Sequence, residues 1–139
     1  MPRLNNSKAK ILMTVAGLAL LAVAVWAQDP VKVGPDVYKS IFENERIRVN
    51  EINFKTGAHI DFHSHPDHVV YWIQGGTLRI WNKGADGKVT DSVDVTGKSG
   101  EVLFLTACTH AGTNIGKTDL KLVQVELKEP APAKSAGKK

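Results

Sequence analysis

The stretch FHSHPDHVVYW, residues 62–72, contains three of the five histidines of this chain. A proline and an aspartate separate the second of these histidines, His65, from the third, His68. The residues that follow are mainly β-branched or aromatic, which is typical of a strand. We therefore interpret the stretch as the end of one strand, a tight corner at Pro66–Asp67, and the beginning of the next strand.

Short strand-like segments continue on both sides of this corner. Each is rich in β-branched or aromatic residues or alternates between apolar and polar positions, and turn-forming residues separate them. The expected strands cover residues 36–44, 46–54, 58–65, 68–74, 77–82, 89–95, 101–106 and 120–128. Many short strands with regular turns predict an all-β sandwich or barrel.

Residues 1–27 have the features of a secretory signal peptide. Three basic residues and no acidic ones precede an apolar run at 11–26, and the small residue Ala27 follows it. An uncleaved membrane anchor is the alternative, but the run is near the lower limit of about 17 residues for spanning a bilayer. Cleavage is therefore favoured. The signal peptide is expected to precede a barrel domain at 28–128, and the protein is expected to be periplasmic or secreted.

The charge of the domain left after cleavage argues against nucleic acid as a partner. The whole chain has 18 basic and 14 acidic residues, and removal of residues 1–27 takes away three basic ones, so the balance becomes 15 − 14 = +1. A near-neutral domain without a basic stripe has no electrostatic footprint for nucleic acid. Residues 129–139, composed mainly of Pro, Ala, Gly and Lys, are expected to form a disordered tail.

Alternation along the expected strand at 58–65 places His59, Asp61, His63 and His65 on one face. A single histidine on a strand is more often a hydrogen-bonded structural residue than a ligand. An H-x-H pair with a third histidine three residues later favours a metal site, because imidazole suits Zn, Cu, Fe and Ni.

Two further histidines extend this candidate site. The corner after His65 allows His68 to begin the next strand and point to the same centre. His110 is far away in sequence, as expected where a barrel brings distant strands together around one cavity.

The spacing between the glycines and the histidines resembles that of a known family. Gly57 precedes His63 by five intervening residues, His65 follows in H-x-H, and His68 lies six intervening residues before Gly75. This arrangement resembles the first motif of the cupins, G-x5-H-x-H-x3,4-E-x6-G. His68 stands where the family has glutamate, and the loop before it is one residue shorter.

The second cupin motif, G-x5-P-x-G-x2-H-x3-N, has a counterpart later in the chain. Gly100 matches its first glycine, and His110 and Asn114 match its last two positions. Thr106 occupies the proline position, the inner glycine has no match, and the spacing before the histidine is one residue shorter. The resemblance covers residues 40–127.

The resemblance implies a single cupin-type β-barrel, also called a double-stranded β-helix or jelly roll, with one divalent metal ion: Fe, Mn, Ni, Cu or Zn. It implies that His63, His65 and His110 are the three imidazole ligands. His68 is either a fourth ligand or a histidine on the rim. Four neutral imidazoles would leave the full +2 charge of the ion, which favours an anionic, chelating oxygen ligand.

Other residues are candidates for the surroundings of the site. His59 and Asp61 either orient a ligand histidine or form a polar rim. Cys108 shares the parity of His110, so it either faces the cavity or packs in the core. As the only cysteine, it cannot form an internal disulfide. The domain must therefore be held together by its core, a metal or a partner subunit.

Two aromatic or aliphatic residues are expected to form one wall of the pocket. Val70 and Trp72 share the parity of His68 along their strand. If Gly75–Gly76 is a two-residue hairpin turn, Arg79 faces Trp72 across the hairpin. An arginine there would bind a carboxylate beside the metal.

The resemblance implies a metal-dependent oxidoreductase of the dioxygenase type acting on a small oxygen-chelating molecule. One alternative is a cupin that binds metal or a small ligand without catalysis. Another is an isomerase or epimerase, for which His59 or Asp61 would be the base. Homodimers formed through the sheets are common in the family. Contact with a membrane is expected only if residues 1–27 remain attached.

Cleavage after Ala27 predicts that the mature protein begins at Gln28. We expect the periplasmic fraction of expressing cells to contain a protein whose intact mass corresponds to residues 28–139. Recovery of the full-length chain from the membrane fraction would instead identify residues 1–27 as an anchor.

Overall fold

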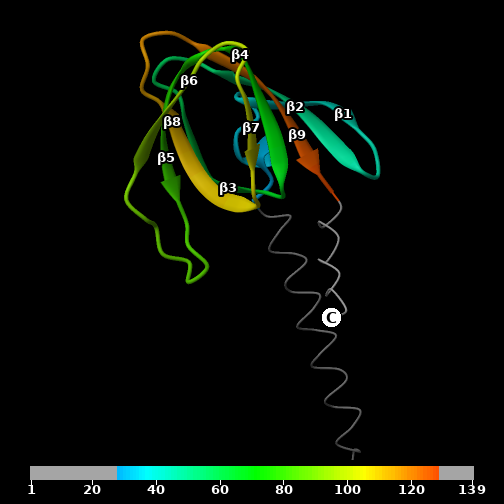
Figure 1. Cartoon of the computed structure of the whole chain (residues 1–139). Helices are drawn as coiled ribbons and strands as arrows, with labels where there is room; N and C mark the ends of the chain where they lie inside the picture. Colours follow the sequence, from blue (N-terminus) through cyan, green and yellow to red (C-terminus); the bar gives the residue numbers. More distant parts are fainter. Residues whose placement is uncertain (1–27, 129–139) are drawn as a thin grey trace, which may run out of the picture.

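The computed structural model describes residues 28–128, which form two antiparallel sheets facing each other (Figure 1). The five-stranded sheet has, in spatial order, β1 (Tyr38–Glu43), β2 (Ile47–Phe54), β9 (Leu120–Leu127), β4 (His68–Gln74) and β7 (Val102–Leu105). The four-stranded sheet has β3 (His59–His65), β8 (Cys108–Asn114), β5 (Gly76–Asn82) and β6 (Val93–Gly97). A short helix, α2 (Pro30–Val33), packs against β3 and β1.

The all-β prediction is confirmed for this part of the chain. Seven of the expected strands coincide closely with β1 to β5, β7 and β9, and the expected strand at 89–95 only overlaps β6, which is shifted towards Gly97. β8 was not among the expected strands, because its sequence CTHAGTN has little apolar alternation. The expected signal segment at 1–27 and the expected tail at 129–139 lie outside the described residues. Within residues 28–128, no helix is long and apolar enough to cross a membrane.

The interior between the sheets is divided into an apolar half and a polar half. Along β2, the buried positions change from Asn50 to Ile52 and Phe54. Along β9, they change from leucines at the start of the strand to Gln124 and Glu126 at its end. Because β2 and β9 pair in antiparallel register, the polar residues of both strands lie at the same end of the barrel. The apolar core therefore occupies the opposite end.

Close packing in the apolar half explains why residue 97 is a glycine. A methyl group placed on Gly97 would come within 2.2 Å of a ring carbon of Trp72, well inside van der Waals contact. The indole of Trp72 on one sheet therefore lies directly against the backbone of β6 on the other. This contact holds the two sheets together where no histidine is present.

A bulge in β3 changes which side chains face the interior. The pairing of β3 with β8 shifts register between Ile60 and His63, so an extra residue is accommodated in β3. Ile60, His63 and His65 consequently all point inward, whereas Asp61 is exposed. The prediction that simple alternation puts four polar residues on one face is wrong, because a bulge reverses the parity of the residues before it.

β4 and β5 do not form a hairpin. β4 pairs with β7 and β9, while β5 pairs with β6 and β8, so the chain passes from one sheet to the other at Gly75. A side chain at Gly75 would collide with the carbonyl oxygen of Gly97 at 2.5 Å. The glycine pair therefore marks a crossing between sheets, and the expected pairing of Trp72 with Arg79 does not occur.

Candidate metal centre

Three histidines from two neighbouring strands meet in the polar half of the interior. β3 contributes His63 and His65, and β8 contributes His110, which pairs directly opposite His63 in the register of the sheet. One ring nitrogen of each histidine lies within 4.8 Å of one in each of the others. The centroids of the three rings are 4.7 to 5.2 Å apart. The geometry thus forms a compact group of imidazoles that could hold one metal ion.

Hydrogen bonds at Nδ1 determine the tautomers of His63 and His65. In His63, Nδ1 lies 2.8 Å from the carbonyl oxygen of Asp61, which can only accept. In His65, Nδ1 lies 2.7 Å from Oε1 of Glu126. Both Nδ1 atoms therefore carry the proton and donate it, which leaves a lone pair on each Nε2 for a metal ion.

The Nε2 atom of His65 is buried and has no hydrogen-bond partner among residues 28–128. A buried polar atom without a partner normally costs about 1–3 kcal/mol, so such atoms require an explanation. Coordination of a metal ion would satisfy this lone pair. Ring nitrogens about 2.1 Å from one tetrahedral ion lie about 3.4 Å apart. The three nitrogens lie within 4.8 Å of one another, so binding of an ion would draw them together, by up to about 1.4 Å for a pair at this limit.

His68 lies beside this group at the beginning of β4. Its side chain is almost fully buried, and its ring centroid is 4.9 Å from that of His65. Its Nδ1 donates to the carbonyl oxygen of Pro66 at 2.8 Å, so its Nε2 also carries a lone pair. His68 is not one of the three histidines within mutual reach of a single ion. Its role as a fourth ligand remains a prediction.

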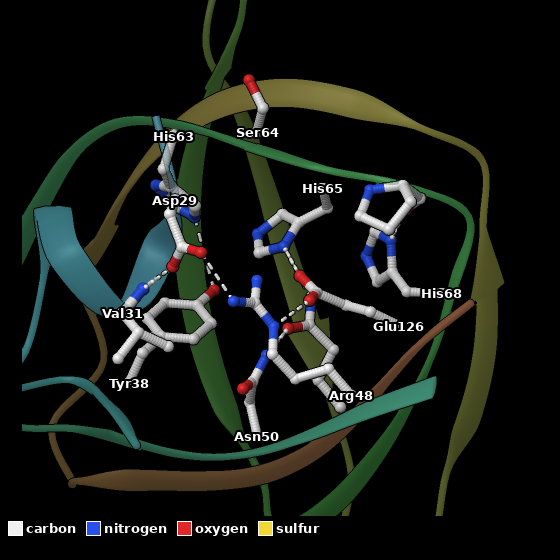
Figure 2. A network of polar contacts seen from close by, with 12 residues as sticks. Asp29, Val31, Tyr38, Arg48, Asn50, His63, Ser64, His65, His68 and Glu126 are labelled. Atoms are coloured by element: carbon white, nitrogen blue, oxygen red, sulfur yellow. Dashed lines mark hydrogen bonds and ion pairs between the residues drawn. The ribbon is translucent and has the colours of Figure 1, made fainter. Parts of the chain in front are cut away.

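A buried ion pair lies directly behind His65. Glu126 accepts from Nε of Arg48 at 2.6 Å through one oxygen and from His65 through the other. The guanidinium of Arg48 also donates to Asp29 at 2.6 Å, so it is held between two carboxylates (Figure 2). The two carboxylates and the one guanidinium sum to a net charge of −1. This charge compensates in part for a cation placed among neutral imidazoles.

Sequence reasoning missed this ion pair, although a signal for it was present. Asn50, Gln124 and Glu126 occupy inward positions in phase with buried apolar residues of β2 and β9. Asn50 donates to Gln124 at 3.1 Å, and the amide of Gln124 lies 3.3 Å from Nδ1 of His65. Polar residues at the inward phase of an otherwise apolar strand are the pattern that could have identified them.

Burial sets the protonation state of the candidate ligands. Loss of hydration and, to a smaller extent, the neighbouring His65 together lower the pKa of His63 to about 4, against the opposing effect of the bond to Asp61. The pKa values of His68 and His110 are also lowered, chiefly by burial. Burial opposes ionisation of Glu126, but the bonds from His65 and Arg48 outweigh it and lower its pKa. His63, His68 and His110 are therefore neutral imidazoles beside the ionised carboxylate of Glu126, and neutral imidazole is the form that ligates a metal ion.

The predicted surroundings of the site are only partly brought together. Cys108 is half-buried, and its Sγ lies 3.8 Å from Nδ1 of His110. Val70 and Trp72 face the interior on the same side of β4 as His68, as parity predicts. Both belong to the apolar cluster, however, with Trp72 packed on Gly97.

Three other predicted residues do not reach the site. The bulge in β3 turns His59 and Asp61 outward, where their side chains are 47% and 89% exposed. His59 bonds to Thr113, and Asp61 orients His63 only through its backbone carbonyl oxygen, so the two exposed side chains agree with the alternative of a polar rim. Arg79 forms a two-pronged ion pair with Asp94 on the neighbouring strand β6, outside the metal centre. Arg79 pairs opposite Thr113, which also pairs opposite the exposed His59, so Arg79 lies on the outer face of the four-stranded sheet.

Comparison with solved structures identifies this architecture. A cupin domain from Bordetella pertussis Tohama I matches with a TM-score of 0.57 and 25% identity, over 67% of this chain and 93% of that chain. The chain belongs to the cupin superfamily. A cupin superfamily protein from Desulfitobacterium hafniense DCB-2 has a TM-score of 0.50 and 18% identity, over 67% and 77% of the two chains. A cupin with a double-stranded β-helix fold from Methanocaldococcus jannaschii has a TM-score of 0.50 and 17% identity, over 66% and 78%.

No protein-family model matches this cupin by sequence, and no curated protein does so either. The second motif departs from the family pattern, but one of its residues, Asn114, keeps a structural role. Asn114 is buried and donates to the carbonyl oxygens of Phe54 and Thr118, and it accepts from the backbone of Gly116. It therefore closes the turn after β8. Its position in the motif is retained even where the proline and the inner glycine before it are replaced.

The lowered histidine pKa values predict that the metal-free protein is destabilised by mild acid. Unfolded imidazoles take up protons near their ordinary pKa of about 6.5, whereas folded His63 does so only near 4. Between these values the unfolded state binds more protons, so stability falls as the pH decreases, by on the order of 3 kcal/mol for His63 alone. Urea unfolding of chelator-treated protein between about pH 7.5 and 4 will measure this.

His63→Gln is the control, since glutamine does not titrate. Its stability should depend less on pH than that of the wild type, while His68 and His110 still contribute. An unfolding free energy of the wild type that does not change across this range would contradict burial of neutral imidazoles.

Proposed function

We propose that this cupin binds one divalent transition-metal ion through His63, His65 and His110, with His68 as a fourth ligand, and acts as an exported oxidoreductase of the dioxygenase type. The observation that carries the metal site is the buried, unpartnered Nε2 of His65 beside two further imidazoles. Export rests on residues 1–27, which resemble a signal peptide.

The type of donor favours a transition metal over calcium or magnesium. Calcium and magnesium prefer oxygen ligands, and the three clustered residues offer only imidazole nitrogen. The nearest carboxylate, Glu126, already uses both oxygens for His65 and Arg48. Its charge is therefore expected to act through the imidazole of His65 and not by direct ligation.

The residues of the chain supply orientation and charge in the proposed reaction. A redox-active ion would supply the electron transfer and the attraction for an anionic oxygen substrate. The carbonyl oxygens of Asp61 and Pro66 hold His63 and His68 with their Nε2 atoms deprotonated. Burial keeps these imidazoles neutral near pH 7, so the ion does not have to displace protons there.

Of the alternatives, a non-catalytic metal-binding cupin differs from this proposal mainly in the metal it carries. A zinc ion closed by four histidines would be inert. An isomerase would need a base beside the metal, and both candidate bases, His59 and Asp61, lie exposed on the outer side of β3. We therefore favour the oxidoreductase.

Metal analysis of protein purified without added ions tests the proposal directly. We expect about one equivalent of Fe, Mn, Ni or Cu per chain and a lower melting temperature after chelation, because bound metal stabilises only the folded state. His65→Ala should abolish stoichiometric binding. His59→Ala is the matched control, since His59 is an exposed histidine on the same strand.

The outcome distinguishes the candidate functions. Tightly held zinc with no position open to added anions would support the non-catalytic alternative. Absence of any bound ion, with an unchanged melting temperature after titration with each metal, would refute the metal centre.

The role of His68 can be tested separately. We predict that His68→Ala lowers metal affinity by at least about 10- to 100-fold, the loss that is typical when a supporting group of a metal site is removed. His68→Glu should retain the ion and reduce the charge of the centre by one. Competition titrations with Mn, Fe, Ni, Cu and Zn will measure both effects. Affinities of His68→Ala equal to those of the wild type would make His68 a rim residue.

A further inference from the structure

The hydroxyl group of Tyr38 is buried beside the imidazoles and poorly bonded. Tyr38 begins β1, is 6% exposed, and packs its ring at centroid distances of 5.4 Å from His63 and 5.7 Å from His65. Within residues 28–128, its hydroxyl has one hydrogen-bond partner, Nε2 of His63, at 3.4 Å. A hydroxyl donor normally approaches its acceptor to about 2.8 Å, so this bond is long.

The acceptor in this bond is the nitrogen on which the metal centre depends. The Nδ1 proton of His63 is committed to the carbonyl oxygen of Asp61, so the lone pair facing Tyr38 is the one available for coordination. A metal ion on that lone pair removes the only acceptor of the hydroxyl. A buried donor without an acceptor is costly, so the loaded centre needs a new acceptor at this place.

We propose that the Tyr38 hydroxyl donates a hydrogen bond to a small anion bound beside the imidazoles, and so selects ligands that present an acceptor atom there. This inference rests on the metal centre proposed above. It adds a group for recognising the ligand that the histidines themselves would not provide, since the Nε2 lone pairs of His63 and His65 would be taken up by the ion.

The state of the phenol agrees with a role as donor. The ordinary pKa of a tyrosine phenol is about 10. The phenol therefore keeps its proton at neutral pH. A protonated phenol can donate to an anion, and its proton helps to compensate for bringing that anion into a buried site.

The position of Tyr38 in the fold also agrees with a role in recognition. In Figure 2 a dashed line joins the hydroxyl of Tyr38 to His63, within the polar network that also contains Arg48 and Glu126. Tyr38 stands on the five-stranded sheet, whereas His63 stands on the four-stranded sheet. The hydroxyl thus reaches across the interior to the metal centre from the opposite wall.

The chain provides a matched control for the test. It contains only two tyrosines, and Tyr71 is 46% exposed on the outer side of β4. Tyr38→Phe and Tyr71→Phe each remove one hydroxyl and retain the ring. Far-UV circular dichroism and thermal melts of the metal-free variants check that both fold.

The experiment measures azide binding to the copper(II)-loaded protein through the azide-to-copper absorption band. We expect Tyr38→Phe to keep the copper affinity of the wild type and to weaken azide binding about 10- to 100-fold, the usual value of a hydrogen bond to a charged group. Tyr71→Phe should bind azide like the wild type. Equal azide affinities in Tyr38→Phe and the wild type would overturn the inference.

Two further outcomes separate this inference from the proposed function. If the wild type takes up copper but binds no azide, the metal centre stands and the inference fails. If the wild type takes up no metal at all, the proposed function itself fails. Loss of copper binding in Tyr38→Phe would also overturn the role as anion donor, because that role leaves the metal ligands intact.

A second variant increases the strength of the donor. Growth of the Tyr71→Phe variant on 3-fluorotyrosine labels position 38 alone, since no other tyrosine remains. The fluorinated phenol is a stronger hydrogen-bond donor, so azide should bind several-fold more tightly than to the unlabelled variant. Unchanged or weaker binding of azide in this protein would count against donation from position 38.

Discussion

The ion pair between Arg48 and Glu126 holds the polar half of the interior together. Arg48 lies on β2 and Glu126 on β9, and the second oxygen of Glu126 reaches across to His65 on β3 in the other sheet. The guanidinium also bonds to Asp29, in the segment that precedes α2. Removal of Arg48 would leave the buried carboxylate of Glu126 without its cation, at a cost of about 3–5 kcal/mol. The orientation of His65, and with it the candidate metal centre, depends on this pair.

The two ends of the barrel contribute differently to stability and to the candidate site. Trp72, Ile52 and Leu120 fill one end with apolar groups and supply the burial that favours folding. The other end buries His63, His65 and His68 together with charged and amide groups, which contribute little hydrophobic stabilisation. A small domain with such an interior gains from any ligand that binds only its folded state. The proposed metal therefore has a structural role in addition to a chemical one.

The histidine group could be predicted from sequence, but its surroundings could not. The H-x-H pair and the matching second motif are local patterns, and His63, His65 and His110 do come together. The bulge in β3 and the change of sheet at Gly75 depend on how strands pair over long distances, which alternation does not report. The positions of His59, Asp61 and Arg79 were wrong for this reason. Glu126 could not be assigned to the site from sequence, because its bonds to Arg48 and His65 join strands that are far apart in the chain.

The replacement of the family glutamate by His68 and the position of Glu126 can be understood together. The carboxylate that the first cupin motif places among the ligands is absent, while a carboxylate stands directly behind His65. In the proposed centre, negative charge would reach the ion through an imidazole and would be reduced by the opposing Arg48. The ion would keep more of its own charge than with a direct carboxylate ligand, which increases its attraction for an anion. A protonated Tyr38 on the opposite wall suits such a ligand, because it offers a hydrogen-bond donor without adding negative charge.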